Sequence, residues 1–173
     1  VQLIEQGLLS LDSRVADIIP EFAGENRDEI RVNHLLTHTS GLPDMIPENM
    51  AYRKEFRPLS DFIRRICTVD LLFKPGTGIS YQSTGIAILG EIVLRITGTA
   101  LPDFLASTFF DPLRMGDTGL GNRRVDDRRI PIIRVPDDQI DAEWHWNRDY
   151  WRGLAVPWGG MFSTVGDISL YLQ

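Results

Sequence analysis

The stretch FKPGTGISYQSTGIAILGEIV, residues 73–93, joins a Pro-Gly loop to the most regular apolar pattern in the chain. Beyond the loop, apolar residues recur at the spacing of one helix face, which predicts a buried amphipathic helix that ends at Gly98. The residues of that face are Ile86, Leu89, Ile92, Val93 and Ile96. Tyr81 and Ser83 stand where the turn enters the helix. If Tyr81 takes part in chemistry, it needs a reacting group to serve, and the question is whether the chain contains that group.

Weaker patterns extend outward from this segment. Helices are predicted over residues 32–39 and 59–67, after Thr99, and after the capping pair Thr164 and Asp167. In contrast, residues 42–57 have the polar, proline-bearing composition of a loop, and the run IPIIRV, residues 130–135, has that of a short strand. The sequence therefore predicts a mainly α fold with long loops and few short strands.

Length and composition favour one globular domain over residues 1–173. The chain is 43% apolar and 24% charged, and 173 residues can enclose a substantial core. A net charge of −6 without any basic run argues against nucleic-acid binding. No apolar run reaches the length of about 18 residues that a membrane-spanning helix needs. The single cysteine, Cys67, lies in an apolar segment and is expected to be a core residue.

A search for a complete hydrolytic site inside the chain finds no nucleophile. A G-x-S-x-G elbow is absent at every serine. An S-x-x-K pair is also absent, because the residues three positions before the two lysines are Ala51 and Leu71. The tripeptide KPG at Lys74 lies in a proline-bearing loop and not in the strand that a K-T-G motif needs.

Two further groups of residues have competing interpretations. His34 and His38 share a helix face as metal ligands can, but no third ligand follows at a recognisable spacing, so we expect hydrogen-bonding roles and no metal. The tryptophans could stack on a substrate or form a satellite core beneath a long loop, and we favour the core. They are Trp144, Trp146, Trp151 and Trp158.

Several segments, which follow one another along the chain in the family's order, resemble the β-lactamase-related serine hydrolases. This family includes class C β-lactamases, D-alanyl-D-alanine carboxypeptidases, esterases and amidases. RVNHLLTHTSGLPD, residues 31–44, is similar to the most recognisable stretch of the family, and residues 73–98 resemble the segment with its Y-x-N motif. Further similarity lies in GLLSLDSRVADIIPEF, FFDPLRMGDTGLG and PWGGMFSTVGDISLYLQ. The resemblance implies the helical lobe of the α/β β-lactamase/transpeptidase-like fold, with most of the sheet missing.

The resemblance also implies a chemistry and a set of site residues. In the family, an S-x-x-K serine attacks an acyl carbonyl, and the motif tyrosine shuttles its proton. On this basis Tyr81 is the catalytic tyrosine, and Ser83, Gly159 and Gly160 are substrate-binding residues. Ser83 replaces the usual asparagine and offers only a hydroxyl, which favours an ester over a β-lactam. A phenol ordinarily has a pKa near 10 and needs nearby positive charge to act as a base.

The resemblance places the S-x-x-K serine before Val1 and the K-T-G or H-x-G motif after Gln173. We therefore expect a fragment that is inactive alone, with a small-molecule acyl substrate in the parent enzyme and no cofactor. The alternative is a non-catalytic helical interaction domain derived from the same fold. Helices without their sheet would expose apolar surface, so self-association is expected. The family favours an extracytoplasmic location in a bacterium.

Overall fold

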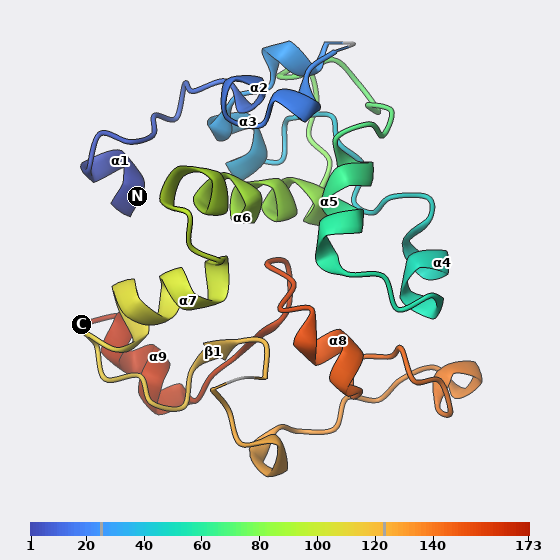
Figure 1. Ribbon diagram of the computed structural model, residues 1–173, viewed down its shortest axis with the longest axis vertical. Coiled ribbons are helices and arrows are strands. Elements are labelled where there is room, and N and C mark those ends of the chain that lie inside the picture. The colour runs from blue at the N-terminus through green and yellow to red at the C-terminus, as the bar shows by residue number, and fades with distance from the viewer. Residues whose placement is uncertain (25, 123) are drawn as a thin grey trace. The chain divides into compact units, whose positions relative to one another are not determined.

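The computed structural model describes residues 1–24, 26–122 and 124–173. The fold is mainly helical, and the described residues contain only two short strands, which confirms the predicted fold class. The chain divides into two compact units, which are residues 1–49 with 60–98 and residues 50–59 with 99–173. Each unit is described by itself (Figure 1).

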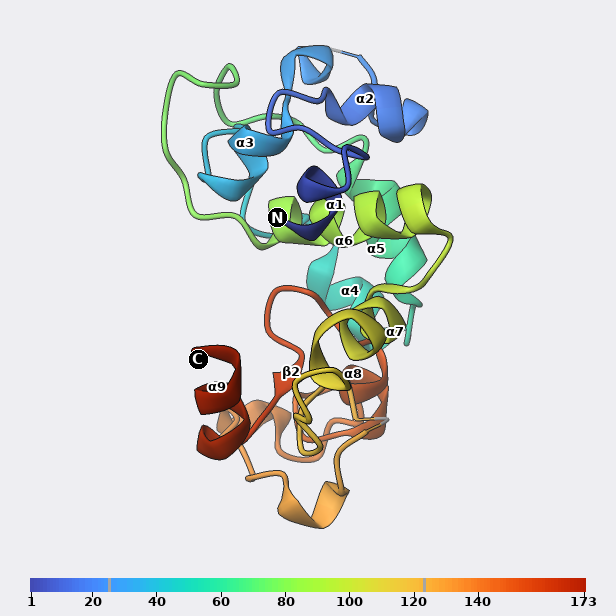
Figure 2. The same ribbon diagram turned by 90° about the vertical axis from the view of Figure 1, so that its left-hand side faces the viewer.

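The first unit is built around α6, Ser83–Thr97, the helix predicted from the apolar pattern. It packs against α2, Val15–Ile18, and α3, Val32–Leu36 (Figures 1 and 2). Gly98 ends α6 as predicted, with a φ of 69° and its N–H donating to the Leu94 carbonyl. The remaining elements are α1 (Gln2–Glu5), the 3-10 turns η1 (Pro20–Phe22) and η2 (Arg27–Glu29), and α5 (Leu59–Ile66).

The core of the first unit consists of aliphatic and aromatic side chains that exclude solvent. Its fully buried members include Val15, Ile19, Phe22, Ile30, Leu35, Ile88 and Ile92. Burial of each such side chain contributes about 1.5–3 kcal/mol relative to exposure. Cys67 is buried beside them as predicted, and burial raises the pKa of its thiol to about 11.

Backbone hydrogen bonds join the segment after α3 to the loop before α6. The N–H of Leu72 donates to the Gly41 carbonyl at 2.7 Å, and the N–H of Gly76 donates to the Thr39 carbonyl at 2.8 Å. Gly41 has a φ of +83°, and a Cβ at this position would lie 2.1 Å from the Phe73 carbonyl oxygen. Only glycine therefore allows the two segments to approach this closely.

The second unit combines short helices with a small antiparallel sheet. Strand β1, Gly119–Leu120, pairs with β2, Met161–Phe162, so that Gly119 lies opposite Phe162. Its helical elements are α4 (Asn49–Lys54), α7 (Leu101–Leu105), the π-helical turn η3 (Ala106–Phe110), the 3-10 turns η4 (Asp127–Arg129) and η5 (Asp137–Gln139), α8 (Asp149–Gly153) and α9 (Val165–Tyr171). Figure 2 shows α7, α8 and α9.

Three local predictions for this unit are wrong. Residues 130–135 form no strand. The Asn147 side-chain amide pairs with the backbone of Ile133 instead, because its Oδ1 accepts from the Ile133 N–H at 2.8 Å and its Nδ2 donates to the Ile133 carbonyl at 2.7 Å. Residues 42–57 contain α4 and are not only a loop. The buried side chain of this helix is that of Arg53, so the sequence lacks the apolar periodicity that would predict a helix here. Helix α7 begins after Ala100 and not after Thr99.

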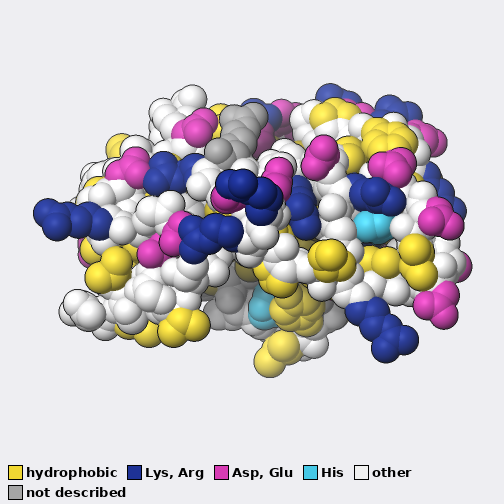
Figure 3. Space-filling view, turned by 90° about the horizontal axis from the view of Figure 1, so that it is seen from below, with side chains coloured by type: hydrophobic (Ala, Val, Ile, Leu, Met, Phe, Trp, Pro, Cys, Tyr) yellow, Lys and Arg dark blue, Asp and Glu magenta, His cyan; other side chains and the backbone are white. Residues whose placement is uncertain are grey.

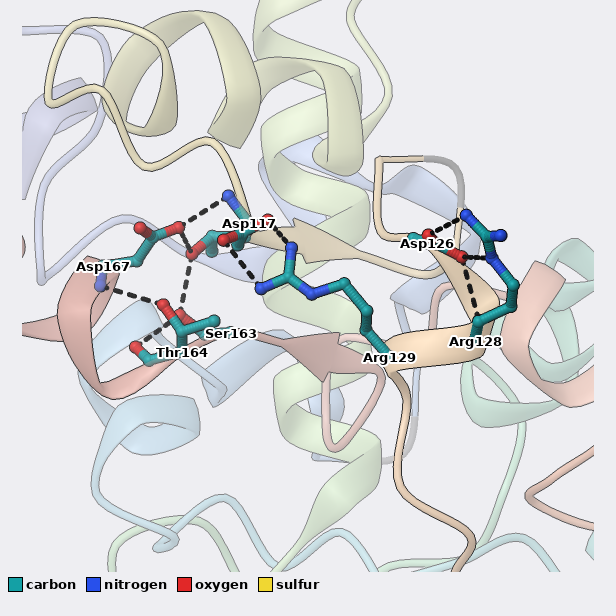
Figure 4. A network of polar contacts seen from close by, with 8 residues as sticks. Asp117, Asp126, Arg128, Arg129, Ser163, Thr164 and Asp167 are labelled. Atoms are coloured by element: carbon teal, nitrogen blue, oxygen red, sulfur yellow. Dashed lines mark hydrogen bonds and ion pairs between the residues drawn. The ribbon is translucent and has the colours of Figure 1, made fainter.

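Hydrogen bonds at the start of α9 confirm the predicted capping pair and extend it (Figure 4). The Thr164 hydroxyl accepts a hydrogen bond from the N–H of Asp167 at 3.1 Å. The Asp167 carboxylate in turn accepts from the N–H of Asp117 at 2.8 Å and from the hydroxyl of Thr118 at 2.7 Å. Arg129 pairs with the Asp117 carboxylate at 2.9 Å. One buried carboxylate thus ties α9 to the entry of β1.

Tryptophans in the second unit surround the buried side chain of Arg53. The Arg53 guanidinium carbon lies 5.0, 5.8 and 4.3 Å from the ring centroids of Trp144, Trp146 and Trp151. Its Nη2 donates to the Trp144 carbonyl at 3.3 Å, while its Nε has no hydrogen-bond partner among the described residues. Burial lowers the pKa of Arg53. Three of the tryptophans therefore pack around a cation, which agrees with the satellite-core interpretation.

We expect Gly41→Ala to lower the free energy of unfolding by about 3 kcal/mol. The substitution combines an unfavourable positive φ with a clash against Phe73. Gly98→Ala is the matched control, because it has a φ of +69° but open space around the new Cβ, and should cost only about 1 kcal/mol. Urea denaturation followed by circular dichroism measures both values, and equal losses would contradict the packing argument.

Arg53→Ala should lower the free energy of unfolding by about 2–4 kcal/mol, because the tryptophans lose both the cation and the packed side-chain stem. Arg64→Ala, at an exposed position of α5, should stay within about 0.5 kcal/mol of the parent. Urea titrations of the two variants make the comparison. A loss at Arg53 no larger than that at Arg64 would show that the tryptophans need no cation.

Candidate functional site

Tyr81 stands immediately before α6 and presents its ring to solvent. Its exposed fraction is 62%, whereas the next two residues, Gln82 and Ser83, are buried. The Tyr81 ring lies against His38, with ring centroids 4.9 Å apart and planes tilted by 42°. Within the part of the chain that the structure describes, the Tyr81 hydroxyl makes no hydrogen bond. The Tyr81 ring therefore contacts the His38 ring on one side, and most of the side chain stays exposed to solvent.

Gln82 anchors the backbone on which Tyr81 stands. Its side-chain Nε2 donates to the carbonyls of His34 and Leu35, each at 3.3 Å, and its Oε1 accepts from the Ser40 hydroxyl. Its backbone N–H donates to Nδ1 of His38 at 3.4 Å. A fully buried amide with partners on both ends fixes the chain direction, because leaving any of these groups unpaired is costly.

Asp44 caps α6 from a distant part of the chain. Its Oδ1 accepts from the N–H of Ser83 at 2.9 Å and from the Ser83 hydroxyl at 2.6 Å. The N–H of Thr84 donates to the Asp44 carbonyl at 3.1 Å. Gln82, the residue in the N-cap position, makes no side-chain cap of its own. A carboxylate here satisfies free N–H groups and complements the positive end of the helix dipole.

The capping role also changes what Ser83 offers. Its hydroxyl is 2.6 Å from Asp44 and donates its proton there, and the residue is buried. Sequence reasoning missed Asp44, although it closes the HTSGLPD run that carries much of the resemblance. The structure therefore brings Tyr81, Ser83, His38 and Asp44 together within the first unit.

His34 and His38 both use a ring nitrogen to hold backbone. Nδ1 of His34 accepts from the N–H of Arg31 at 3.2 Å, and Nδ1 of His38 accepts from Gln82. Burial, and then the charge of Arg31, lower the pKa of His34. Apart from the two residues left undescribed, the chain brings no three metal-binding side chains together.

The glycines of the predicted site, Gly159 and Gly160, belong to the second unit. Gly160 donates its N–H to the Val156 carbonyl at 2.8 Å, and its own carbonyl accepts from the N–H of Gly121 at 2.8 Å. A Cβ at Gly160 would lie 2.8 Å from two Val156 backbone atoms, whereas Gly159 is exposed with open space around it. Packing therefore explains Gly160 but not Gly159.

The two lysines of the chain have partners of their own. Lys74 Nζ lies 3.4 Å from the Glu29 carboxylate, and Lys54 Nζ lies 6.0 Å from the Trp144 ring centroid. The arrangement in the first unit thus presents an exposed phenol on a backbone held by hydrogen bonds. It supplies neither the serine nor the lysine of an S-x-x-K pair.

Asp44→Ala should lower the free energy of unfolding by about 1–2 kcal/mol, because α6 loses its cap and Ser83 loses an acceptor. Asp44→Asn keeps an acceptor oxygen and should recover much of this loss. Asp70→Ala, an exposed aspartate outside the helices, should change stability by less than about 0.5 kcal/mol. Circular dichroism during urea titration gives all three values, and equal effects at Asp44 and Asp70 would reject the capping role.

Comparison with known sequences shows relatives of several activities. Residues 1–173 match the β-lactamase family. The chain is 38% identical to penicillin-binding protein 4 of Amycolatopsis lactamdurans, over 97% of the chain and 44% of that protein. It is 32% identical to lovastatin esterase of Penicillium rubens, over 77% of the chain and 39% of that protein. The chain thus spans less than half the length of these curated relatives.

Solved structures show the same similarity. The D-amino acid amidase of Ochrobactrum anthropi SV3, in complex with L-phenylalanine amide, superposes with a TM-score of 0.77 at 25% identity, and the match covers 99% of this chain and 49% of the amidase. A penicillin-binding protein homologue from Caulobacter crescentus superposes with a TM-score of 0.71 at 24% identity, over 98% of this chain and 49% of that one. With the family match over its whole length, the chain belongs to the β-lactamase family of serine hydrolases and penicillin-binding proteins.

Proposed function

We propose that this chain supplies the tyrosine part of an acyl-transfer site in a β-lactamase-like serine hydrolase. In this proposal a serine from an S-x-x-K motif outside the 173 residues attacks an acyl carbonyl. Tyr81 passes the serine proton to the leaving group and takes a proton back from water during deacylation. The chain alone is inactive, because its sequence contains neither this serine nor a K-T-G or H-x-G motif.

The exposed phenol of Tyr81 is the observation that carries the proposal. A tyrosine that only filled the core would be buried, yet Tyr81 is 62% exposed between residues that are fully buried or hydrogen-bonded. Hydrogen bonds fix Gln82 and Ser83 beside a tyrosine whose ring lies against His38. Pre-organisation of a proton-transfer group is what such an arrangement provides.

The substrate proposed is a small acyl compound, an ester or amide in preference to a β-lactam. On the resemblance to the family's Y-x-N motif, Ser83 takes the place of the asparagine, and its hydroxyl is already donated to Asp44. An amide side chain that could donate and accept toward a ligand is therefore missing from this position. The names of relatives, which include esterases and penicillin-binding proteins, support this range of substrates. Gly159 and Gly160 are proposed to contact the acyl substrate in the complete enzyme.

Tyr81→Phe tests the proposal in a protein that carries this chain together with an S-x-x-K serine. Turnover of an aryl ester and of a chromogenic cephalosporin should fall about 100- to 10,000-fold in kcat, because a proton-transfer group is lost. Tyr171→Phe, at an exposed tyrosine of α9, should leave turnover unchanged. The 173-residue chain alone should give no turnover of either substrate.

Two outcomes would contradict this assignment. Turnover by the 173-residue chain that Tyr81→Phe abolishes would place the nucleophile inside the chain. Full activity of Tyr81→Phe in the complete protein would remove the tyrosine from the mechanism, and would favour a non-catalytic helical interaction domain.

We also propose that the chain self-associates. Large apolar side chains are exposed in both units, with exposed fractions of 82% for Ile79 and 88% for Ile132. Exposed apolar surface favours contacts between copies. Sedimentation velocity should show a weight-average mass that rises with protein concentration, and Leu72→Ser with Ile79→Ser, at two exposed apolar positions of the first unit, should reduce the rise. A compact monomer of 19.6 kDa at every concentration would reject self-association.

A further inference from the structure

A pocket of about 710 Å³ lies within the second unit, between the segment 127–140 and the start of α8. Its volume falls within the range of about 300–1,000 Å³ that small-molecule sites occupy. Five aliphatic side chains give the wall its apolar part, and they are Ile130, Ile132, Ile133, Val135 and Ile140. None of the residues that line it belongs to the Tyr81 site.

Positive charge is concentrated on the same wall. Four arginines line the pocket against two aspartates, Asp127 and Asp137, although the chain as a whole carries a net charge of −6. Figure 3 shows a face of the molecule on which basic, acidic and hydrophobic side chains are interspersed. Arg128 is bound at 2.7 Å by Asp126, so it is already neutralised. Arg134 is exposed and has no ion pair among the residues described.

Arg152 is the inner cation of the pocket and is incompletely paired. It is 9% exposed, its Nε has no hydrogen-bond partner in the described structure, and its Nη1 lies 3.7 Å from Asp127. Arg148 lies 3.4 Å from Glu143, also a loose pair, and its Nε is 3.2 Å from Nε2 of the buried His145. A buried guanidinium with unused donors is costly unless another acceptor occupies the site.

We propose that this pocket binds an aliphatic carboxylate, with the head group on Arg152 and Arg134 and the chain along Ile130, Ile133 and Ile140. The guanidinium fork matches a carboxylate in two parallel hydrogen bonds. The two aspartates in the wall oppose a dianion, so a singly charged head group is favoured over a phosphate monoester. The aliphatic wall requires an apolar body on the ligand, which excludes simple inorganic anions.

Isothermal titration calorimetry with hexanoate and octanoate tests this proposal on the protein without reference to catalysis. Octanoate should bind with a dissociation constant of about 1 mM or tighter. Each added methylene should improve affinity about three- to fourfold. Octanamide, which lacks the charge, and octyl phosphate, which is a dianion, should each bind at least tenfold more weakly.

Three arginine variants separate the site from general electrostatic attraction. Arg152→Gln and Arg134→Gln should each weaken octanoate binding at least tenfold, and Arg134 is exposed, so its variant keeps the fold even if Arg152→Gln does not. Arg64→Gln removes the same charge from an exposed position of α5 and should change affinity less than twofold. Equal binding of octanamide and octanoate, or equal weakening by Arg64→Gln and Arg134→Gln, would overturn the proposal. Because the readout is binding, its failure would leave the role of Tyr81 unaffected.

Discussion

The N-terminus of α6 depends on the Asp44 carboxylate, which accepts two hydrogen bonds from Ser83. A helix of this length presents free N–H groups at its start, and the residue in the N-cap position provides no side-chain acceptor. The acceptor comes instead from the segment after α3. The same segment also contacts the loop before α6 at three other places. The His38 ring accepts from the Gln82 N–H, the Gln82 amide bonds to the segment, and Gly41 lies against Phe73. The position of the Tyr81 phenol is therefore a consequence of how one helix is capped.

The two units are held by different kinds of interaction. In the first, apolar side chains of α2, α3 and α6 form the core, and backbone hydrogen bonds close the loops over it. In the second, charged groups have a larger part, because Arg53 lies among tryptophans and the Asp167 carboxylate joins α9 to β1. The first unit thus presents an exposed tyrosine on a hydrogen-bonded backbone, while the second presents a pocket whose arginines are incompletely paired.

The sequence predicted what depends on local pattern. The apolar period of α6, its end at Gly98 and the Thr164–Asp167 cap were all visible because each involves residues within a few positions of one another. Asp44 and Ser83 lie 39 residues apart, so no local signal connects them. Helix α4 was not predicted, because its buried residue is an arginine and the helix therefore has no apolar periodicity. The run at residues 130–135 has the composition of a strand, but the Asn147 amide replaces the neighbouring strand that it would need.

The arrangement of aromatic residues has an optical consequence. All four tryptophans lie in the second unit, and three of them face the same guanidinium, whereas the first unit contains none. Indole emission therefore reports on the second unit alone, and a cation against the rings makes that emission sensitive to local opening. Ellipticity at the helix band, in contrast, includes α6 and so reports strongly on the first unit. A comparison of the two signals distinguishes joint from separate unfolding of the units without any added label.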